Sequence, residues 1–298
     1  MITPHIDPTH ALPEYLANEP MDTILEDTLA ENVRTALAED IGTGDLTAKL
    51  LPAEQTATAR ITTREAAVLA GRPWFDACFR TLDPNCTLTW LAADGEAIET
   101  GQILAEVSGN ARALLSAERP ALNFLQTLSA IATQTRDYVE AVAGTQARIL
   151  DTRKTLPGLR IASKYAVRMG GGKNHRVGLF DGILIKENHI AAAGSIATAL
   201  IAARQLAAPS VSIQIEVESL AELEQALHAG AQLILLDNFS TDMMREAVRL
   251  TAGRAELEAS GGVDLHSVRA IAQTGVDRIS IGALTKNIRA VDLSMRFV

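Results

Sequence analysis

Short apolar runs in the second half of the chain are each followed by residues that bind carboxylates, phosphates, sugars or metal ions. The groups that follow successive runs are Asp151-Thr152-Arg153-Lys154, Lys186-Glu187-Asn188-His189, Glu216 with Glu218, Asp237-Asn238, Ser260-Gly261-Gly262 and Gly282. Arg and Lys contact carboxylates and phosphates, and carboxylates hold sugar hydroxyls or Mg²⁺. Glycine-rich turns expose backbone N–H groups to phosphate. The set predicts a site for a phosphosugar and a second, anionic substrate.

Positive charge is concentrated around the first of these groups. Between Arg148 and Arg176 the chain has eight Lys or Arg and a single acidic residue, Asp151, although its net charge is −9. Three of the basic residues lie four apart and predict a solvated helix face, namely Arg160, Lys164 and Arg168. Arg153 and Lys154 lie beside turn residues instead. A cationic cluster on an acidic protein favours a small, multiply charged anion over a polymer.

Single groups in this set also have a structural explanation. Asp237 is placed to cap a helix beginning at Ser240, and Lys186 is placed to form a buried ion pair with Glu216. For one strand end such an explanation is sufficient. Because polar groups recur at the same end of every strand, the joint pattern favours a binding or catalytic site.

The elements that must position these groups alternate regularly. Six apolar runs alternate with helical stretches, and they are Arg148–Leu150, Gly182–Ile185, Ser212–Val217, Leu233–Leu236, Leu257–Ala259 and Arg278–Ile281. The alternation predicts a parallel sheet, either a closed or nearly closed α/β barrel or an open doubly wound sheet. We favour the barrel, with a further strand near Val177–Phe180. The carboxyl ends of barrel strands converge on one face, where a helix beginning near Asp264 would help to bind phosphate.

The first half of the chain has a different pattern. A helix is expected from Thr23 to about Glu39, followed by half-buried strands at Ala57–Thr63, Cys86–Leu91 and Ile103–Val107. These strands predict an antiparallel sheet. A long helix should cover about Leu114–Val142, with Ser116 as its cap and Pro120 in its first turn.

Composition excludes several classes of protein. A chain of 298 residues suggests one large or two medium domains, at about 100–200 residues each. The net charge of −9 and the few aromatic residues argue against a nucleic-acid binder. The longest nearly uncharged apolar stretch, Ile190–Ala203, is shorter than the roughly 20 residues of a membrane span. Met1–Pro20 lacks the features of a secretory signal, so a cytoplasmic protein is expected. Cys78 and Cys86 predict reduced thiols and no structural zinc site.

Several motifs occur together in a characteristic order. They are Asp151-Thr-Arg-Lys-Thr155 with Pro157-Gly158, Lys164-Tyr-Ala-Val167, Gly170-Gly-Gly-Lys-Asn-His-Arg176, Ile185-Lys-Glu-Asn-His189, Leu236-Asp-Asn-Phe239 and Gly282-Ala-Leu-Thr285. On these residues the chain resembles the quinolinate phosphoribosyltransferase family, over about residues 24–298.

The resemblance implies a fold and an assembly. The expected α/β fold, like that of type II phosphoribosyltransferases, has an N-terminal open α/β sandwich and a C-terminal incomplete α/β barrel of about seven strands. A flexible extension would cover residues 1–23, the sandwich 24–117 and the barrel 118–286, with the tail 287–298 packing back on the sandwich. A homodimer with shared active sites is implied, and whether dimers form hexamers is left open.

The resemblance also implies a reaction and its residues. The phosphoribosyl group of phosphoribosyl pyrophosphate would pass to quinolinate, giving nicotinate mononucleotide, pyrophosphate and CO₂ in NAD biosynthesis, with Mg²⁺ as cofactor. The implied catalytic residues are Lys154, Lys186, Glu216 and Asp237, and the two carboxylates would also hold Mg²⁺, which binds mainly through the substrate. The implied quinolinate contacts are Thr152, Arg153, His175, Arg176 and Lys186, with Arg119 from the partner subunit. The implied phosphoribosyl pyrophosphate contacts are Lys154, Glu216, Asp237, Ser260, Gly261, Gly262, Ser280, Gly282 and Lys286.

Three positions depart from the family's pattern. Pro120 and Ala130 lie on the helix that carries Arg119, so they bear on its placement, and Lys173 is an extra positive charge that we expect to face solvent.

Three alternatives stay open. A relative of the same fold associated with molybdate transport would use a different acceptor, and a Schiff-base aldolase would use Lys186 as nucleophile. A non-catalytic phosphosugar-binding protein would leave Glu216 and Asp237 unexplained.

Overall fold

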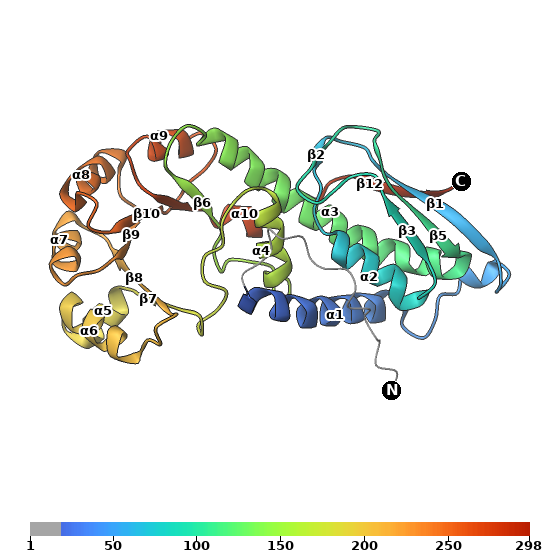
Figure 1. The fold of residues 1–298 in the computed structure, drawn as a ribbon, viewed down its shortest axis with the longest axis horizontal. Coiled ribbons are helices and arrows are strands. Elements are labelled where there is room, and N and C mark those ends of the chain that lie inside the picture. Colours follow the sequence, from blue (N-terminus) through green and yellow to red (C-terminus); the bar gives the residue numbers. More distant parts are fainter. Residues whose placement is uncertain (1–18) are drawn as a thin grey trace. The chain divides into compact units, whose positions relative to one another are not determined.

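The computed structural model describes residues 19–298 (Figure 1). The chain forms two compact units, one of residues up to Thr133 with Ile161–Met169 and Arg289–Val298, the other of Gln134–Arg160 and Gly170–Ile288. Most of the extension expected at residues 1–23 lies outside the described residues. Helix α1 (Glu19–Ile41) includes the last five residues of that range, so it begins before the expected Thr23.

The first unit contains the expected antiparallel sheet. Its four strands have the order β12-β1-β5-β3, with β12 at Leu293–Phe297, β1 at Thr56–Thr63, β5 at Ile103–Asn110 and β3 at Thr87–Trp90. Strands β2 (Ala67–Val68) and β4 (Ala97–Ile98) form a separate pair, and a short 3-10 helix covers Ala48–Leu50. The C-terminal strand β12 pairs with β1, with Met295 opposite Ile61.

Aromatic side chains fill the core of the first unit. Phe75 on α2 (Arg72–Leu82) meets Trp90 of β3 edge to face, with ring centroids 5.2 Å apart. Trp74 packs in the same way on Tyr165 of α4 (Arg160–Met169), at 5.3 Å. Because α4 is almost entirely buried, the solvated face expected for its basic residues is wrong: Lys164 is fully buried.

The long helix α3 (Ala111–Ala141) begins earlier than expected. The side-chain oxygen of Asn110 accepts hydrogen bonds from the backbone N–H groups of Arg112 and Ala113, so Asn110 is the cap. Ser116 is not; its hydroxyl donates to Asp45 at 2.8 Å. Pro120 therefore lies in the helix interior rather than in the first turn. Its missing N–H removes one helix hydrogen bond at a buried position.

The second unit is built on six parallel strands in the order β6-β11-β10-β9-β8-β7. The strands cover the predicted runs: β6 Arg148–Leu150, β7 Gly182–Ile185, β8 Ser212–Val217, β9 Leu233–Asp237, β10 Glu256–Ser260 and β11 Arg278–Ser280. No strand forms at Val177–Phe180. An isolated parallel bridge joins Leu150 to Lys173 instead, next to β6. The sheet is thus an incomplete α/β barrel of six strands and one bridge, because β6 and β7 are its outer strands.

Side chains of the six strands alternate between two environments. One face packs against helices and is apolar, as Ile149, Ile215, Ile234, Leu257 and Ile279 illustrate. The helices are α5 (Glu187–Ala193), α6 (Ile196–Leu206), α7 (Leu220–His228), α8 (Thr241–Thr251), α9 (Val268–Ala272) and α10 (Ala283–Lys286), and α6, α7 and α8 flank the outside of the sheet (Figure 1). The other face holds the polar residues at alternate positions.

Two further expectations concern the cysteines and membranes. Cys78 and Cys86 are both free, and burial raises the pKa of the Cys78 thiol to about 12 and that of Cys86 to about 11. Neither thiol is therefore activated. Among the residues the structure describes, no helix has the length and apolar character needed to cross a membrane.

Candidate active site

The register of the parallel strands brings the predicted groups together at their carboxyl ends. Asp237 is directly opposite Ser260 on the neighbouring strand, and Lys186 follows the residue that pairs with Ile215. At the edge of the sheet formed by β6 and β11, Gly282 lies close to Lys154 and Thr152. A Cβ atom built at Gly282 would lie 2.9 Å from Cδ of Lys154 and 3.6 Å from Oγ1 of Thr152. The ends of all six strands therefore form a continuous polar row in the second unit.

Two guanidinium groups beside this row lie close enough for their charges to interact. Burial lowers the pKa of Arg176 from its usual value, and the positive charge of Arg153 lowers it further, while Asp181 acts in the opposite sense. Asp181 accepts hydrogen bonds from the backbone N–H groups of Val177 and Gly178. Neither Arg153 nor Arg176 forms an ion pair with any carboxylate in the described part of the chain. Such a pair is electrostatically unfavourable until an anion binds between or beside the two groups.

The two loops that carry these arginines are cross-linked. Arg160 donates to the backbone oxygens of Arg153, at 3.4 Å, and Val177, at 3.2 Å. The backbone of Lys154 is held in turn by the buried hydroxyl of Thr285, which donates to its oxygen at 2.8 Å. Arg176 also donates to the oxygen of Gly182 at 2.8 Å. The backbone of Arg153 and the guanidinium group of Arg176 are therefore held in place before any ligand binds.

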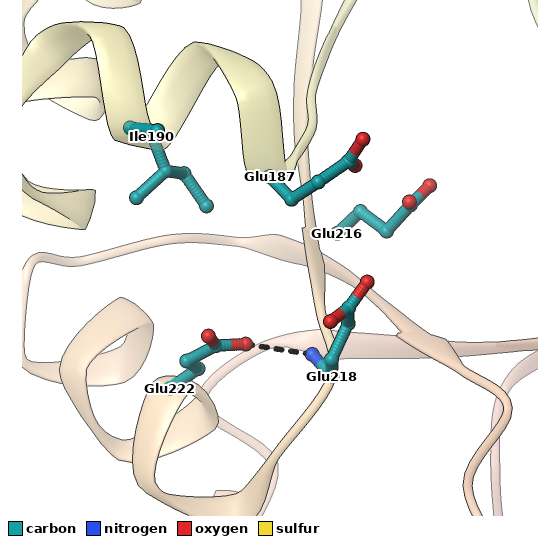
Figure 2. A pocket seen from close by; sticks show the side chains of 6 residues that line it. Glu187, Ile190, Glu216, Glu218 and Glu222 are labelled. Carbon is teal, nitrogen blue, oxygen red and sulfur yellow. Dashed lines mark hydrogen bonds between the residues drawn. The ribbon is translucent and has the colours of Figure 1, made fainter.

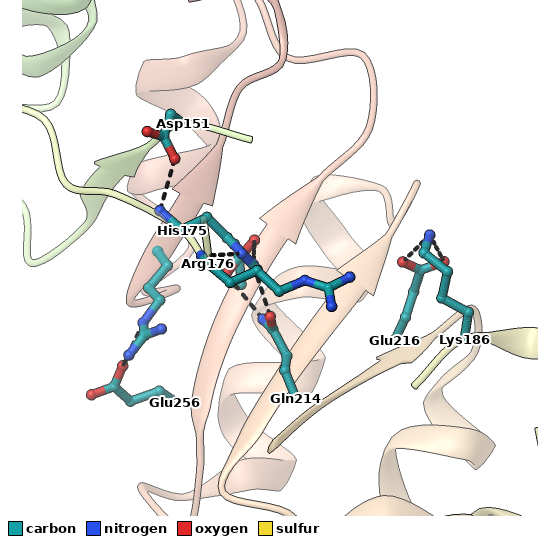
Figure 3. Close-up of polar contacts among 9 residues, drawn as sticks. Asp151, His175, Arg176, Lys186, Gln214, Glu216 and Glu256 are labelled. Atoms are coloured by element: carbon teal, nitrogen blue, oxygen red, sulfur yellow. Dashed lines mark hydrogen bonds and ion pairs between the residues drawn. The ribbon is translucent and has the colours of Figure 1, made fainter. Parts of the chain in front are cut away.

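The ring of His175, one of the predicted quinolinate contacts, is held by protein groups. Its ring nitrogens already have partners in the protein: Nδ1 accepts from the backbone N–H of Arg176 at 2.9 Å, and Nε2 lies 2.9 Å from Oε1 of Gln214 (Figure 3). Its backbone N–H donates to Asp151 at 2.7 Å. Gln214 was not among the predicted site residues, and Asp151 was named only as part of the first group, without a contact of its own. His175 is therefore anchored to the barrel interior.

An ion pair joins two residues predicted for different ligands. Nζ of Lys186 lies 3.0 and 3.3 Å from the two carboxylate oxygens of Glu216 (Figure 3). The Glu216 side chain is 10% exposed and that of Lys186 45%, so one partner is largely desolvated. Lys186 and Glu216 therefore do form the ion pair that was expected if these residues have a structural role. The helix cap expected of Asp237 does not form. Ser240 itself caps α8, and Asp237 instead accepts a hydrogen bond from the side-chain amide of Asn238.

The glycine turn after β10 has a conformation that requires glycine. Gly261 and Gly262 have φ of +102° and +61°, and a Cβ at Gly261 would lie 2.1 Å from Oδ1 of Asn238. The helix expected near Asp264 begins later, at Val268, because Asp264 caps a preceding turn by accepting from the N–H groups of His266 and Ser267. The turn itself, rather than a helix end, is therefore the candidate phosphate cradle.

The remaining predicted residues lie in several places. Ser280 is buried on the inner face of β11, opposite Leu150, and Lys286 is exposed on α10. Lys173 is exposed, as expected. Arg119 belongs to the first unit, where its side chain is 57% exposed and lies 3.9 Å from the carboxylate of Glu118.

The carboxylates at the strand ends do not form a metal site by themselves. Within the described residues, no three His, Cys, Asp or Glu side chains are arranged to hold a metal. Mg²⁺ in phosphoryl sites is commonly bound by one or two carboxylates together with substrate phosphates. Glu216 and Asp237 fit that partial set. They do not form a complete metal site without a substrate.

A small acidic cavity is lined in part by Glu216. It has a volume of about 180 Å³ and is lined by Glu216, Glu218, Glu222 and, from α5, Glu187 and Ile190 (Figure 2). Its charge would repel carboxylates and phosphates. Anionic ligands are therefore directed to the side of the strand ends that carries Lys154, Arg153 and Arg176.

Comparison with known proteins is consistent with this geometry. The family model described as the C-terminal domain of quinolinate phosphoribosyl transferase matches residues 131–296, and the model of the N-terminal domain matches residues 45–129. The chain belongs to the quinolinate phosphoribosyltransferase family. The resemblance found on the motifs from Asp151 to Thr285 is thereby confirmed.

Relatives within the quinolinate phosphoribosyltransferase family match along most of their length. The chain is 47% identical to the probable nicotinate-nucleotide pyrophosphorylase [carboxylating] of Bacillus subtilis, covering 86% of this chain and 89% of the relative. It is 44% identical to the protein of the same name from Synechocystis, covering 88% and 90%.

Solved structures of the quinolinate phosphoribosyltransferase family share the fold. The nicotinate-nucleotide pyrophosphorylase of Francisella tularensis superposes with a TM-score of 0.88 at 47% identity, covering 91% of this chain and 96% of the other. The enzyme from Pyrococcus furiosus, at 17% identity and a TM-score of 0.68, shares the fold alone. These matches confirm the expected α/β fold of type II phosphoribosyltransferases.

Substitution of Gly261 tests the glycine turn. Gly261→Ala should destabilise the protein more than Gly253→Ala, because both positions have positive φ but only Gly261 faces Asn238. The control variant Gly253→Ala should lower the free energy of unfolding by about 1 kcal/mol through backbone strain, and Gly261→Ala should lower it by more. Thermal unfolding measures both. Affinity for phosphoribosyl pyrophosphate, measured by calorimetry, should fall only for Gly261→Ala; equal effects of the two variants would contradict a role for close packing at this turn.

Proposed function

We propose that this protein transfers the phosphoribosyl group of phosphoribosyl pyrophosphate to quinolinate with decarboxylation. The products are nicotinate mononucleotide, pyrophosphate and CO₂, in the de novo synthesis of NAD. The observation that carries the proposal is that Arg153 and Arg176 lie close enough for their charges to interact, while neither forms an ion pair with a carboxylate of the described residues. Quinolinate has two adjacent carboxylates, so it supplies the negative charge that this pair requires. Family membership supports the same acceptor.

The quinolinate half of the site would consist of residues from β6, β7 and the loop before β7. Arg153 and Arg176 bind the carboxylates, and Thr152 and Lys186 lie at the ends of the two outer strands, β6 and β7. His175 contributes mainly through its position, because both ring nitrogens already contact protein groups. Arg119 of the partner subunit completes the set in a homodimer with shared active sites.

The phosphoribosyl pyrophosphate half would lie along the remaining strand ends. Ser260, Gly261, Gly262 and Gly282 offer backbone N–H groups to the 5′-phosphate. Lys154 lies against Gly282 and contributes positive charge beside it, with the exposed Lys286 and the buried Ser280 in supporting positions. Glu216 and Asp237 hold ribose hydroxyls and would hold Mg²⁺ together with the substrate. When bound, Mg²⁺ supplies positive charge that neutralises the pyrophosphate oxygens.

The chemistry has two steps. The ring nitrogen of quinolinate forms a bond to C1 of the ribose as the bond from C1 to pyrophosphate breaks, and the electron pair of that bond leaves with pyrophosphate. The ring nitrogen then carries positive charge, so the bond from ring carbon 2 to its carboxylate breaks, CO₂ leaves and a proton takes its place. Glu216 and Asp237 stabilise the positive charge that develops on the ribose. The protein contributes orientation and charge rather than a covalent intermediate.

The ion pair between Lys186 and Glu216 neutralises two of the charges of the free enzyme's site. Each partner is assigned to a different substrate, so binding of either substrate must compete with the other partner. A ribose hydroxyl on Glu216 releases Lys186 toward quinolinate, and a carboxylate on Lys186 releases Glu216 toward the ribose. The two half-sites are thereby linked.

A direct assay tests the reaction. Purified protein with quinolinate, phosphoribosyl pyrophosphate and Mg²⁺ should form nicotinate mononucleotide and release CO₂, and nicotinate in place of quinolinate should give no product. Removal of Mg²⁺ with a chelator should abolish turnover. Binding of phosphoribosyl pyrophosphate without any turnover of quinolinate would contradict the proposal and favour a different acceptor or a non-catalytic phosphosugar-binding protein.

Arg153→Ala tests the acceptor site. The variant should lose at least about 100-fold in kcat/KM for quinolinate, because one of two guanidinium partners of a desolvated dianion is removed. Its thermal stability should not fall, since the repulsion with Arg176 is relieved. Arg245→Ala is the matched control on the exposed face of α8, where it pairs only with Asp242. Near-normal turnover in Arg153→Ala would exclude this residue from the site.

Mixing inactive chains tests the shared site. Equal amounts of Arg119→Ala and Lys186→Ala chains should regain about a quarter of the wild-type activity once subunits have exchanged randomly, because half of the dimers then contain one intact site. A mixture of Arg153→Ala and Lys186→Ala should regain none, since both residues are assigned to the same chain at each site. Absence of recovery in the first mixture, with exchange demonstrated by mass spectrometry, would argue against sharing.

A further inference from the structure

Three polar side chains inside the barrel form a hydrogen-bonded chain. His175 Nε2 lies 2.9 Å from Gln214 Oε1, and Gln214 Nε2 donates to Glu258 Oε2 at 3.0 Å. Gln214 is 4% exposed and Glu258 1%, and the His175 side chain is 15% exposed. The residues come from β8, β10 and the loop before β7.

The carboxylate of Glu258, at one end of this hydrogen-bonded series, fixes which group donates and which accepts in each hydrogen bond. Glu258 Oε2 accepts from Gln214, so the amide NH₂ of Gln214 faces Glu258 and its oxygen faces His175. An amide oxygen only accepts, so His175 must donate from Nε2. The neutral ring then has an unprotonated Nδ1, which is the atom that accepts the backbone N–H of Arg176. Every hydrogen bond from Glu258 to the backbone of Arg176 therefore has one donor and one acceptor.

These residues lie directly beneath the proposed substrate-binding residues. Gln214 precedes Glu216 by two positions on β8, and Glu258 precedes Ser260 by two positions on β10. Because side chains of a strand alternate between faces, both members of each pair lie on the inner face. Figure 3 shows Gln214 and His175 beside the Arg176 backbone, with Lys186 and Glu216 paired at the ends of β7 and β8.

The fold does not require polar groups at this depth. Leu150 and Leu235, on the same inner face, are 4% and 5% exposed. Burial of Gln214 and Glu258 is costly, since Glu258 Oε1 has no hydrogen-bond partner among the described residues and lies 3.7 Å from His175 Nε2. Such a buried chain is expected where it fixes the geometry of a site.

We propose that Gln214 and Glu258 are positioning residues for the acceptor half of the site. They fix the tautomer and the ring orientation of His175, and through Nδ1 they fix the backbone of Arg176 and hence the place of its guanidinium group. This inference rests on the proposed function for its kinetic consequence. The state of the His175 ring is independent of that function.

Nuclear magnetic resonance tests the ring state in the unaltered protein. With ¹⁵N-labelled histidine, His175 should show the neutral Nε2–H tautomer at neutral pH, and the signal is assigned by its loss in His175→Gln. In Gln214→Leu, which removes the amide at similar volume, the ring signals should shift toward a mixture of tautomers. A wild-type ring protonated on Nδ1 would overturn the proposal whether or not the protein turns over quinolinate.

Kinetics test the consequence for the site. Gln214→Leu and Glu258→Leu should raise KM for quinolinate by roughly 10-fold or more, the size of effect seen when a hydrogen bond supporting a metal-bound histidine is lost. KM for phosphoribosyl pyrophosphate should change much less. Glu258→Gln retains an acceptor for the Gln214 amide and should restore most of the quinolinate affinity.

Gln146→Leu is the matched control. It makes the same chemical change at the opposite end of the barrel, where Gln146 donates to the oxygen of Gly275 at 2.7 Å. Its kinetic constants should equal those of the wild type. If folded Gln214→Leu keeps both the wild-type ring signals and the wild-type KM for quinolinate, the positioning role is wrong. If no variant and no wild-type protein turns over quinolinate, the proposed function fails while the ring measurement still decides the role of Gln214.

Discussion

The hydrogen-bond register of the six parallel strands is the constraint on which the rest of the site depends. Alternation along each strand sends Ile215, Ile234 and Leu257 to the helices and leaves the inner face to other residues. Pairing of Asp237 with Ser260, and of Ile185 with Ile215, then fixes which inner residues lie side by side. A slip of one residue in any strand would exchange its two faces, so the helix-facing apolar core enforces the arrangement of the polar row.

Charge is distributed in this row in two different ways. Lys186 and Glu216 neutralise each other, whereas Arg153 and Arg176 repel each other and are held by backbone contacts from Arg160 and to Gly182. The first arrangement lowers the electrostatic cost of an empty site. The second leaves positive charge at Arg153 and Arg176 that a bound anion would neutralise. Together they explain how a chain of net charge −9 attracts two anionic substrates without a generally basic surface.

Local sequence was sufficient for the six strands of the second unit and for bringing Lys186, Asp237 and Ser260 to strand ends. The β-branched and leucine-rich runs predicted β6 to β11 almost residue by residue, because buried parallel strands have a short, distinctive apolar signal. Features that depend on tertiary contacts were missed. Asn110, rather than Ser116, caps α3; Lys164 is buried because α4 lies in a core; and Asp264 stabilises a turn where a helix start was expected. None of these outcomes is encoded in the spacing of apolar residues.

The inner-face polar residues were missed for a related reason, although a signal existed. Gln214 and Glu258 stand two positions before Glu216 and Ser260, so the period of two places them on the same face as the predicted site. Attention to strand ends alone passed over them. Inner positions such as Leu150 and Leu235 show that this barrel accommodates apolar side chains at that depth. The presence of a buried amide and carboxylate there is accounted for by what they fix: the direction of the hydrogen bonds that end at the backbone of Arg176.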